Sequence, residues 1–381
     1  MKKIPFVLAL LFLASFTLVY GQKTPNPKLS FSQSENLIFL DSETNQNSII
    51  KFRALFTPDG CKKTNTIWLI TGVPGKDWKI KSGGLDNDEV EIEFNKIGNY
   101  SLELTVVYTY SGDDPEEPEE DEITVEKEMA VTVTKNLDEL TQIHADSNYL
   151  KLVKRASSYV VKPEYGEDPT PNIFLAKGYY GIYKKDLNDK MVSDPWAAAV
   201  DCIAAAIELD FNGIYNASIH KIWLNRFQNE LFTNEILNNL DEEEGFFMPY
   251  GGDNKELKIE YRDLSLEGCE VYSTITKYPI SIKLMEAALR YYSRDSRTAN
   301  MIWKDEIPNL EKLTEEDFEN MTETDLLALK YGAMLSAISL TEKSASNIQA
   351  CQILSSLKKV YEYDRGFNAF LKTRYNNCKE E

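Results

Sequence analysis

The chain divides into a part with strand-like alternation and a part with helix-like spacing. From Leu37 onward, short apolar runs are separated by turns rich in Gly, Pro, Asn and Asp, and over Tyr100–Tyr110 apolar and polar residues alternate. A period of two indicates a strand with one buried face. About seven such segments predict an all-β sandwich over residues 22–136. We expect its strands at 49–56, 66–70, 78–80, 90–94, 100–110 and 123–134.

Beyond Asn136 the apolar residues recur at helical spacing, which predicts an all-α domain over residues 137–381. The clearest helix start is Asp194 followed by Pro195, an N-cap residue and a favoured first helical residue. The expected helices are 137–159, 172–184, 196–209, 215–240, 264–275, 279–292, 296–310, 322–340, 344–363 and 367–375.

Residues 1–21 have the order of a secretory signal peptide. Lys2 and Lys3 precede the apolar run Ile4–Val19, and small or compatible residues lie before Gln22. We expect cleavage before Gln22, because the apolar run is short for a membrane span; an uncleaved N-terminal anchor is the alternative. No Cys lies beside the predicted cut, so a bacterial lipoprotein is not expected. The predicted C-terminal helices are not a β-rich sorting domain, so sorting to the surface is not the first expectation. We therefore expect export to the periplasm, with the cell surface and secretion left open.

The stretch Gly98–Val106 reads GNYSLELTV, and Trp68 precedes it by thirty residues. This stretch resembles the GxYxLxLxV segment of PKD-type immunoglobulin-like domains, in which a core Trp lies near that distance. The usual WDFGDG segment is absent, and residues 67–72 read IWLITG instead. The resemblance covers about residues 35–135 and implies a noncatalytic spacer or adhesion module.

The helices at 172–183 and 196–210 resemble a tetratricopeptide (TPR) unit. Gly178 lies near the close-packing position of the first helix, and the second ends in AAAIELD. Small residues let paired helices approach closely. Divergent TPR-like helical repeats of this kind, with an insertion such as 185–193, resemble those of exported Bacteroidota proteins. The resemblance implies a curved surface that binds peptides or proteins; a compact, irregular helical domain without a groove is the alternative.

The formal net charge of −19 narrows the classes of partner that this chain is expected to bind. An acidic surface repels phosphates, so nucleic acid and anionic membranes are not expected partners, and no later segment approaches a membrane span. Eight of the eleven residues 112–122 are carboxylates. Calcium binding is one interpretation. We favour a solvated loop extended by proline and like charge, and the same holds for 86–89.

Residues that could support catalysis are few. The chain has two histidines, His144 and His220, and five widely spaced cysteines. Neither histidine has a metal-ligand partner at i+4, and no nucleophile elbow or phosphate loop is present. We expect no catalytic residue, metal site or cofactor. One cysteine pair could close in an oxidising compartment, leaving at least one free thiol.

These observations predict a noncatalytic cell-envelope protein that binds or scaffolds other proteins through its helical surface. A Bacteroidota secretion or gliding apparatus is the candidate assembly, and the oligomeric state is open. Aromatic residues enriched in interfaces suggest the contact residues: Phe246, Phe247, Tyr250, Tyr291 and Tyr292. The alternatives are a glycan-binding accessory protein related to SusD-type receptors and a hydrolase with an all-α catalytic domain.

Overall fold

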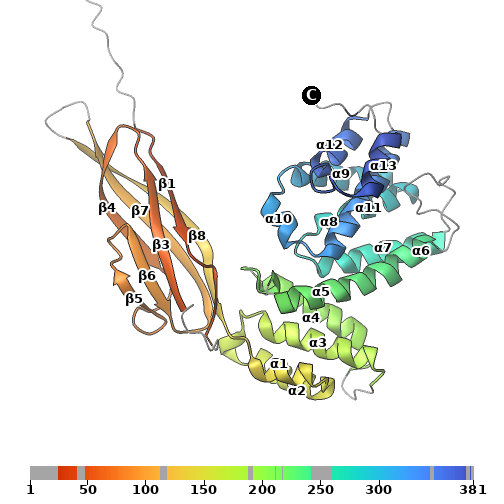
Figure 1. Cartoon of the computed structure of the whole chain (residues 1–381), viewed down its shortest axis with the longest axis horizontal. Coiled ribbons are helices and arrows are strands. Elements are labelled where there is room, and N and C mark those ends of the chain that lie inside the picture. The colour runs from red at the N-terminus through yellow and green to blue at the C-terminus, as the bar shows by residue number, and fades with distance from the viewer. Residues whose placement is uncertain are drawn as a thin grey trace, which may run out of the picture. The chain divides into compact units, whose positions relative to one another are not determined.

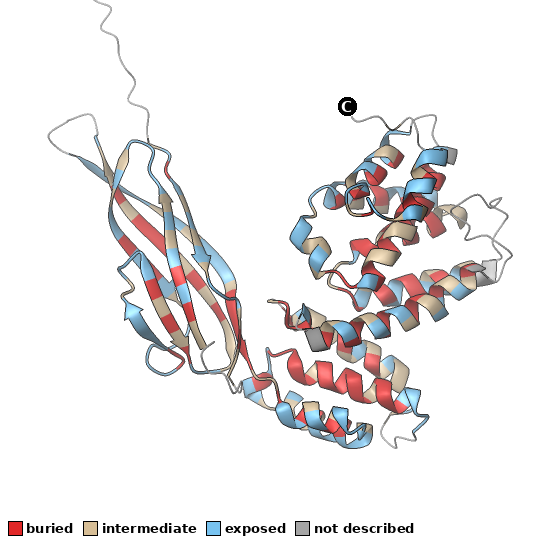
Figure 2. Ribbon diagram, in the orientation of Figure 1, coloured by how far each residue is buried: buried red, intermediate tan, exposed pale blue. Residues whose placement is uncertain are grey.

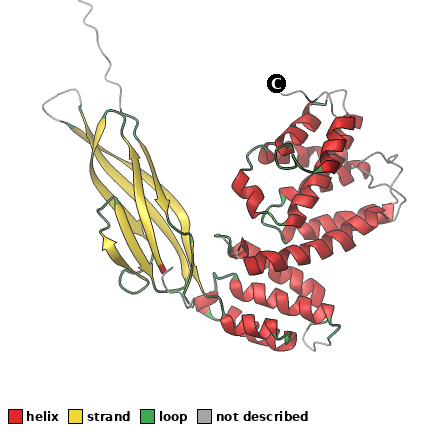
Figure 3. Ribbon diagram, in the orientation of Figure 1, coloured by secondary structure: helices red, strands yellow, loops and turns green. Residues whose placement is uncertain are grey.

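A computed structural model describes residues 25–40, 48–111, 118–187, 192–210, 212–216, 218–241, 259–343, 347–374 and 378. The chain forms two compact units, each with its own core. One comprises the residues up to Ile38 together with Thr44–Val133, and the other comprises Phe39–Glu43 and Thr134–Glu381. Strands therefore precede helices, as the sequence predicts (Figure 3). The predicted signal peptide at 1–21 lies outside the described residues.

The first unit consists of two four-stranded sheets (Figure 1). One has the order β1-β3-β6-β5, formed by β1 (Lys28–Gln33), β3 (Ile49–Thr57), β6 (Glu89–Phe94) and β5 (Trp78–Gly83). The other has the order β2-β8-β7-β4, formed by β2 (Leu37–Phe39), β8 (Glu119–Thr134), β7 (Gly98–Tyr110) and β4 (Cys61–Ile70).

The alternation in β7 gives this unit its core. Tyr100, Leu102, Leu104 and Val106 are buried, as the period of two predicts. Trp68 of β4 is fully buried and contacts Phe52 and Phe31, with ring centroids 6.0 Å and 5.7 Å away. Buried residues lie along strands of both sheets (Figure 2). The ring contacts of Trp68 join the two sheets in one apolar layer, which is the arrangement of a β-sandwich.

The sandwich differs from the prediction at its edge. Residues 28–33 form strand β1, which is not among the strands expected from the sequence. β1 pairs only with β3 and has no fully buried residue, so its apolar signal is weak. Edge strands of this kind depend on backbone pairing more than on apolar pattern.

The second unit is helical throughout its described residues. Its α-helices are α1 (Asp138–Ala145), α2 (Tyr149–Val160), α3 (Thr170–Lys184), α4 (Pro195–Leu209), α5 (Ser218–Leu231), α6 (Asn238–Asp241), α7 (Ile259–Thr274), α8 (Ile280–Tyr292), α9 (Ser296–Leu310), α10 (Glu315–Asn320), α11 (Glu323–Lys343), α12 (Ile348–Leu357) and α13 (Arg365–Arg374). Short 3₁₀ turns lie at Pro163–Tyr165 and Ile214–Asn216.

The start of α4 is confirmed, whereas the single helix expected at 137–159 is wrong. Asp194 caps α4 by accepting a hydrogen bond from the backbone N–H of Ala197. The expected helix breaks into α1 and α2 because Ser147 adopts a positive φ of 55°. Asn148 then caps α2 by accepting from the N–H of Lys151.

Two glycines of α3 permit close packing, but the neighbour is α2. A Cβ atom on Gly178 would lie 2.7 Å from Cγ2 of Val153, and one on Gly181 would lie 2.2 Å from the ring of Tyr149. Glycine therefore serves here as the small residue that closely packed helices need. In the predicted repeat, Gly178 would have faced the following helix instead.

The later helices surround α8, which is buried along most of its length. It packs against α7, α9 and α11, and α11 packs in turn against α12. A helix that is apolar on several faces belongs in the middle of a bundle. The expected pairs 264–275 with 279–292 and 322–340 with 344–363 are present, but α8 joins them into one core with Trp303, Met334 and Phe367.

The long helix expected at 215–240 is present with one irregularity. Between α5 and α6 the chain forms a π-helical segment at Phe232–Leu237. Gly268 of α7 lies directly against it, since a Cβ there would be 2.8 Å from the carbonyl oxygen of Glu235. A π segment inserts an extra residue into a helical turn and widens it.

Candidate functional site

The residues predicted to bind a partner fall into two groups. Phe246, Phe247 and Tyr250 lie outside the described residues. Tyr291 and Tyr292 end α8 and are half-buried. The Tyr291 ring lies 6.0 Å from that of Trp303 on α9, and 5.8 Å from that of Tyr292. Tyr291 therefore packs against the core of the helical unit, and its role in partner binding stays a prediction.

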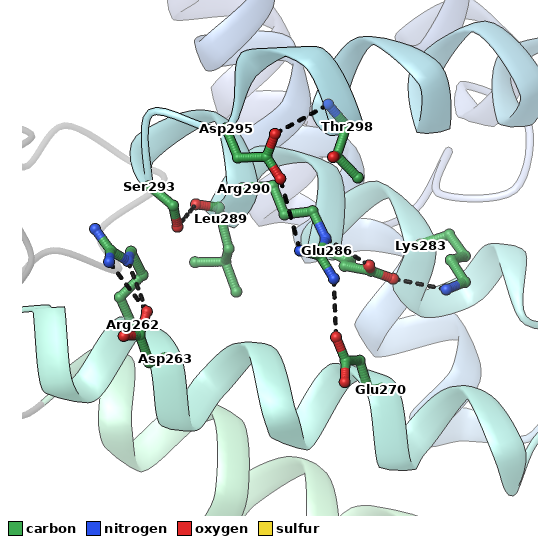
Figure 4. A network of polar contacts seen from close by, with 10 residues as sticks. All are labelled: Arg262, Asp263, Glu270, Lys283, Glu286, Leu289, Arg290, Ser293, Asp295 and Thr298. Atoms are coloured by element: carbon green, nitrogen blue, oxygen red, sulfur yellow. Dashed lines mark hydrogen bonds and ion pairs between the residues drawn. The ribbon is translucent and has the colours of Figure 1, made fainter.

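A network of charges lies beside these tyrosines (Figure 4). Buried Glu286 accepts hydrogen bonds from Lys283 at 2.7 Å and from Arg290 at 2.8 Å. Arg290 also donates to Glu270 on α7 at 2.8 Å and lies 3.8 Å from Asp295. Burial alone would raise the pKa of Glu286, but the two cationic donors outweigh burial and hold that pKa below its ordinary value. The network joins α7, α8 and α9 with its charges paired, which suits a scaffold better than a reaction site.

The least expected polar contact is buried between α3 and α5. Lys177 is only 2% exposed, and its Nζ lies 2.9 Å from Nδ1 of His220. The rings of Phe174 and Trp223 lie 5.1 Å and 5.7 Å from the same ammonium group. Among the described residues no carboxylate forms an ion pair with Lys177. Aromatic faces and an imidazole therefore replace the carboxylate that a buried lysine ordinarily has.

Burial determines how this cluster titrates. It lowers the pKa of Lys177 to about 8, because the charged form is poorly solvated. Burial and the nearby ammonium lower the pKa of His220 to about 3 and that of His144 to about 4. Both histidines of the chain are thus neutral at pH 7. Since His220 accepts from Lys177 through Nδ1, its own proton is on Nε2.

Next to this cluster is a group of rings that we name the aromatic cluster: Tyr180, Tyr183, Trp196, Trp223 and Phe227. Trp196 stacks on Phe227 with ring centroids 4.7 Å apart and planes 19° apart, and Tyr183 lies 5.1 Å from Trp196. Trp223 and Phe227 are buried, Trp196 is half-buried, and Tyr183 is 44% exposed. The cluster therefore reaches the surface at Tyr183 and Trp196.

Charged groups border the cluster. The Tyr180 hydroxyl donates to Glu230 at 2.6 Å, and Lys184 donates to both oxygens of Glu230 at 3.1 Å. Burial, together with the Glu230 carboxylate, raises the pKa of Tyr180 well above its ordinary value. Fixed rings with a polar rim can stack on planar or apolar groups of a ligand and orient it by hydrogen bonds.

No metal-binding constellation occurs within the described part of the chain. It has no group of three or more His, Cys, Asp or Glu side chains that could hold a metal ion. In the acidic turn at 86–89, Asp88 accepts from Thr66 and pairs with Lys63, while Glu89 pairs with Lys51. These carboxylates hold β-strands together. Residues 112–117 of the other acidic segment lie outside the described residues.

The cysteines are divided as the sequence suggested. Cys351 and Cys378 form a disulfide, whereas Cys61, Cys202 and Cys269 are free thiols. Burial raises the pKa of Cys202 to about 12, which keeps this thiol protonated and unreactive. Across the described ranges, no helix has the length and apolar character that a bilayer crossing requires.

Comparisons with protein families, with curated proteins and with solved structures find no match to this chain. The site is therefore interpreted from its own chemistry. Sequence patterns missed the contact of Lys177 with His220, because the two residues are 43 positions apart in sequence. One feature of the sequence did indicate an unusual position for Lys177. It interrupts an otherwise apolar helix, between Phe174 and Tyr180 on the same face.

Proposed function

We propose that this chain is a noncatalytic, exported cell-envelope protein that binds a partner protein through its helical unit. The observation that carries the proposal is the aromatic cluster, in which exposed Tyr183 and half-buried Trp196 pack on a base of buried rings. Aromatic residues fixed by packing give contact area at little entropic cost, and interfaces are enriched in them.

The other features support the same function. A PKD or immunoglobulin-like assignment of the sandwich is supported by Tyr100, whose hydroxyl donates to the carbonyl oxygen of Lys96 at 2.9 Å near the start of β7. Such a tyrosine corner is typical of immunoglobulin-like sandwiches. A TPR-like assignment of α3 and α4 is supported by the packing of these two consecutive helices against each other. The disulfide supports export, because disulfides persist in oxidising compartments.

The test is capture of a partner by the mature chain from envelope extracts of its native host. We expect Tyr183→Ala to reduce the captured protein at least tenfold, since hot-spot aromatics cost about 2 kcal/mol or more when truncated. The matched control is Tyr363→Ala, which removes a tyrosine that is 91% exposed elsewhere in the same unit. Circular dichroism checks that both variants are folded.

Three results would contradict the proposal. Capture that Tyr183→Ala leaves unchanged would remove the aromatic cluster from the interface. Binding to arrayed glycans that the same variant abolishes, without any captured protein, would assign the surface to carbohydrate. Recovery of the full-length chain in the cytosol, with residues 1–21 uncleaved, would contradict export.

A further inference from the structure

The disulfide Cys351–Cys378 encloses the last helix of the fold. Its two cysteines are 27 residues apart in sequence, and α13 lies between them. Cys351 belongs to α12, and Cys378 packs against the core that α8, α9, α11, α12 and α13 share. The bond therefore joins the chain on either side of α13 to one core.

Helix α13 is short and docks on that core through its apolar face. The helix has ten residues, fewer than an isolated helix needs to be stable in water. Phe367 and Phe370 are fully buried in the core. At its start, Asp364 accepts from the N–H of Phe367 at 2.8 Å and from Lys330 at 2.8 Å. Leu371 packs against the same core, and Asn368 donates to the carbonyl oxygen of Glu362 at 2.7 Å. The disulfide closes the chain around this short docked helix.

We propose that the Cys351–Cys378 disulfide is a redox-dependent lock that holds α13 on the core of the helical unit. When the bond is reduced, α13 undocks more often and exposes Phe367 and Phe370. This inference rests on the proposed export, because only an oxidising compartment keeps such a bond closed.

The chemistry of closure is a thiol–disulfide exchange. The Cys351 and Cys378 thiols reduce the disulfide of a thiol–disulfide oxidoreductase of the compartment, which leaves as a dithiol while the Sγ–Sγ bond forms. Two thiols and one disulfide enter and leave the exchange, so hydrogens and electrons balance. Within the helical unit, Cys269 of α7 is fully buried and so is not placed to compete.

Hydrogen exchange of the full mature chain tests the lock. We expect amides of α13 to exchange at least tenfold faster in Cys351→Ser/Cys378→Ser, or with dithiothreitol, while amides of the sandwich are unchanged. Cys202→Ser is the matched control, since it removes a half-buried free thiol and should leave α13 as protected as before. Equal protection of α13 in oxidised and reduced protein would overturn the proposal.

Peptide mapping without reductant, on protein recovered from fractionated cells, separates this inference from the proposed export. Free Cys351 and Cys378 in exported protein would overturn the lock and leave export standing. Protein found reduced in the cytosol, whose α13 becomes protected only on oxidation in vitro, would overturn export and support the lock.

Discussion

Lys177 lies between aromatic rings and the imidazole of His220, and this environment affects how the helical unit responds to pH. His220 takes up a proton at about pH 3 in the folded chain, against an ordinary pKa of 6.5. Between these values the unfolded chain binds more protons, so stability falls as the pH falls below 6.5. For one fully responding site the slope is about 1.4 kcal/mol per pH unit.

Replacing His220 should remove its contribution to the pH dependence of stability. We expect His220→Gln to unfold in urea with a weaker dependence on pH between 6.5 and 4.5 than the natural chain. The difference between the two chains isolates His220 from the carboxylates, which titrate in both. His144→Gln should weaken the pH dependence over this window nearly as much, because the pKa of His144 is also lowered, to about 4, and the two variants should separate only below about pH 4. Parallel slopes for the natural chain and His220→Gln would contradict the assignment.

The lysine gives a second prediction of the same sign, at alkaline pH. Its pKa of about 8 lies below the ordinary 10.5, so the folded chain loses this proton first, and stability rises between pH 8 and 10.5. Lys177→Met keeps the volume and removes the buried charge. We expect it to raise the free energy of unfolding at pH 7 by about 1–3 kcal/mol and to abolish the alkaline rise. A loss of stability would mean that the cation–π contacts outweigh burial.

At the scale of elements, the contact of α11 with α8 depends on Gly332. A Cβ there would lie 2.7 Å from the backbone nitrogen of Met285, and backbone cannot move aside as a side chain can. Gly332→Ala should therefore destabilise the chain by about 1–3 kcal/mol despite the higher helix propensity of alanine. Gly166→Ala is the control, because its nearest contact is an ordinary 3.4 Å. Equal melting temperatures for the two variants would contradict this packing.

Elements were predictable from the sequence where their apolar pattern is strong. The alternation over Tyr100–Tyr110 and the Asp194–Pro195 start each led to the observed element. α10 was missed because none of its residues is buried, although Thr314 and Asp317 form a capping box that marks its start. The Lys177–His220 contact was missed for a different reason: local periodicity says nothing about which helices meet, and this pair is 43 residues apart.

At the scale of the whole molecule, the two units have separate cores, so damage to one should leave the other folded. Trp68→Ala removes the largest side chain from the sandwich core and should destabilise that unit by about 3–5 kcal/mol. Hydrogen exchange should show faster exchange in β3, β4 and β7 while α8 and α11 keep their protection. Simultaneous loss of protection in both units would show that they fold as one.

The π-helical segment at Phe232–Leu237 has a consequence for the ancestry of this chain. One residue inserted into an α-helix rotates the residues that follow by about 100° around the helix axis. Such an insertion is therefore retained only when the facing helix leaves space for the displaced carbonyl group. Gly268 provides that space opposite Glu235. Descendants of a common ancestor should therefore fall into two lineages: those with the extra residue and glycine at position 268, and those that lack the residue and carry a larger side chain there. The insertion and the glycine should have been gained or lost together.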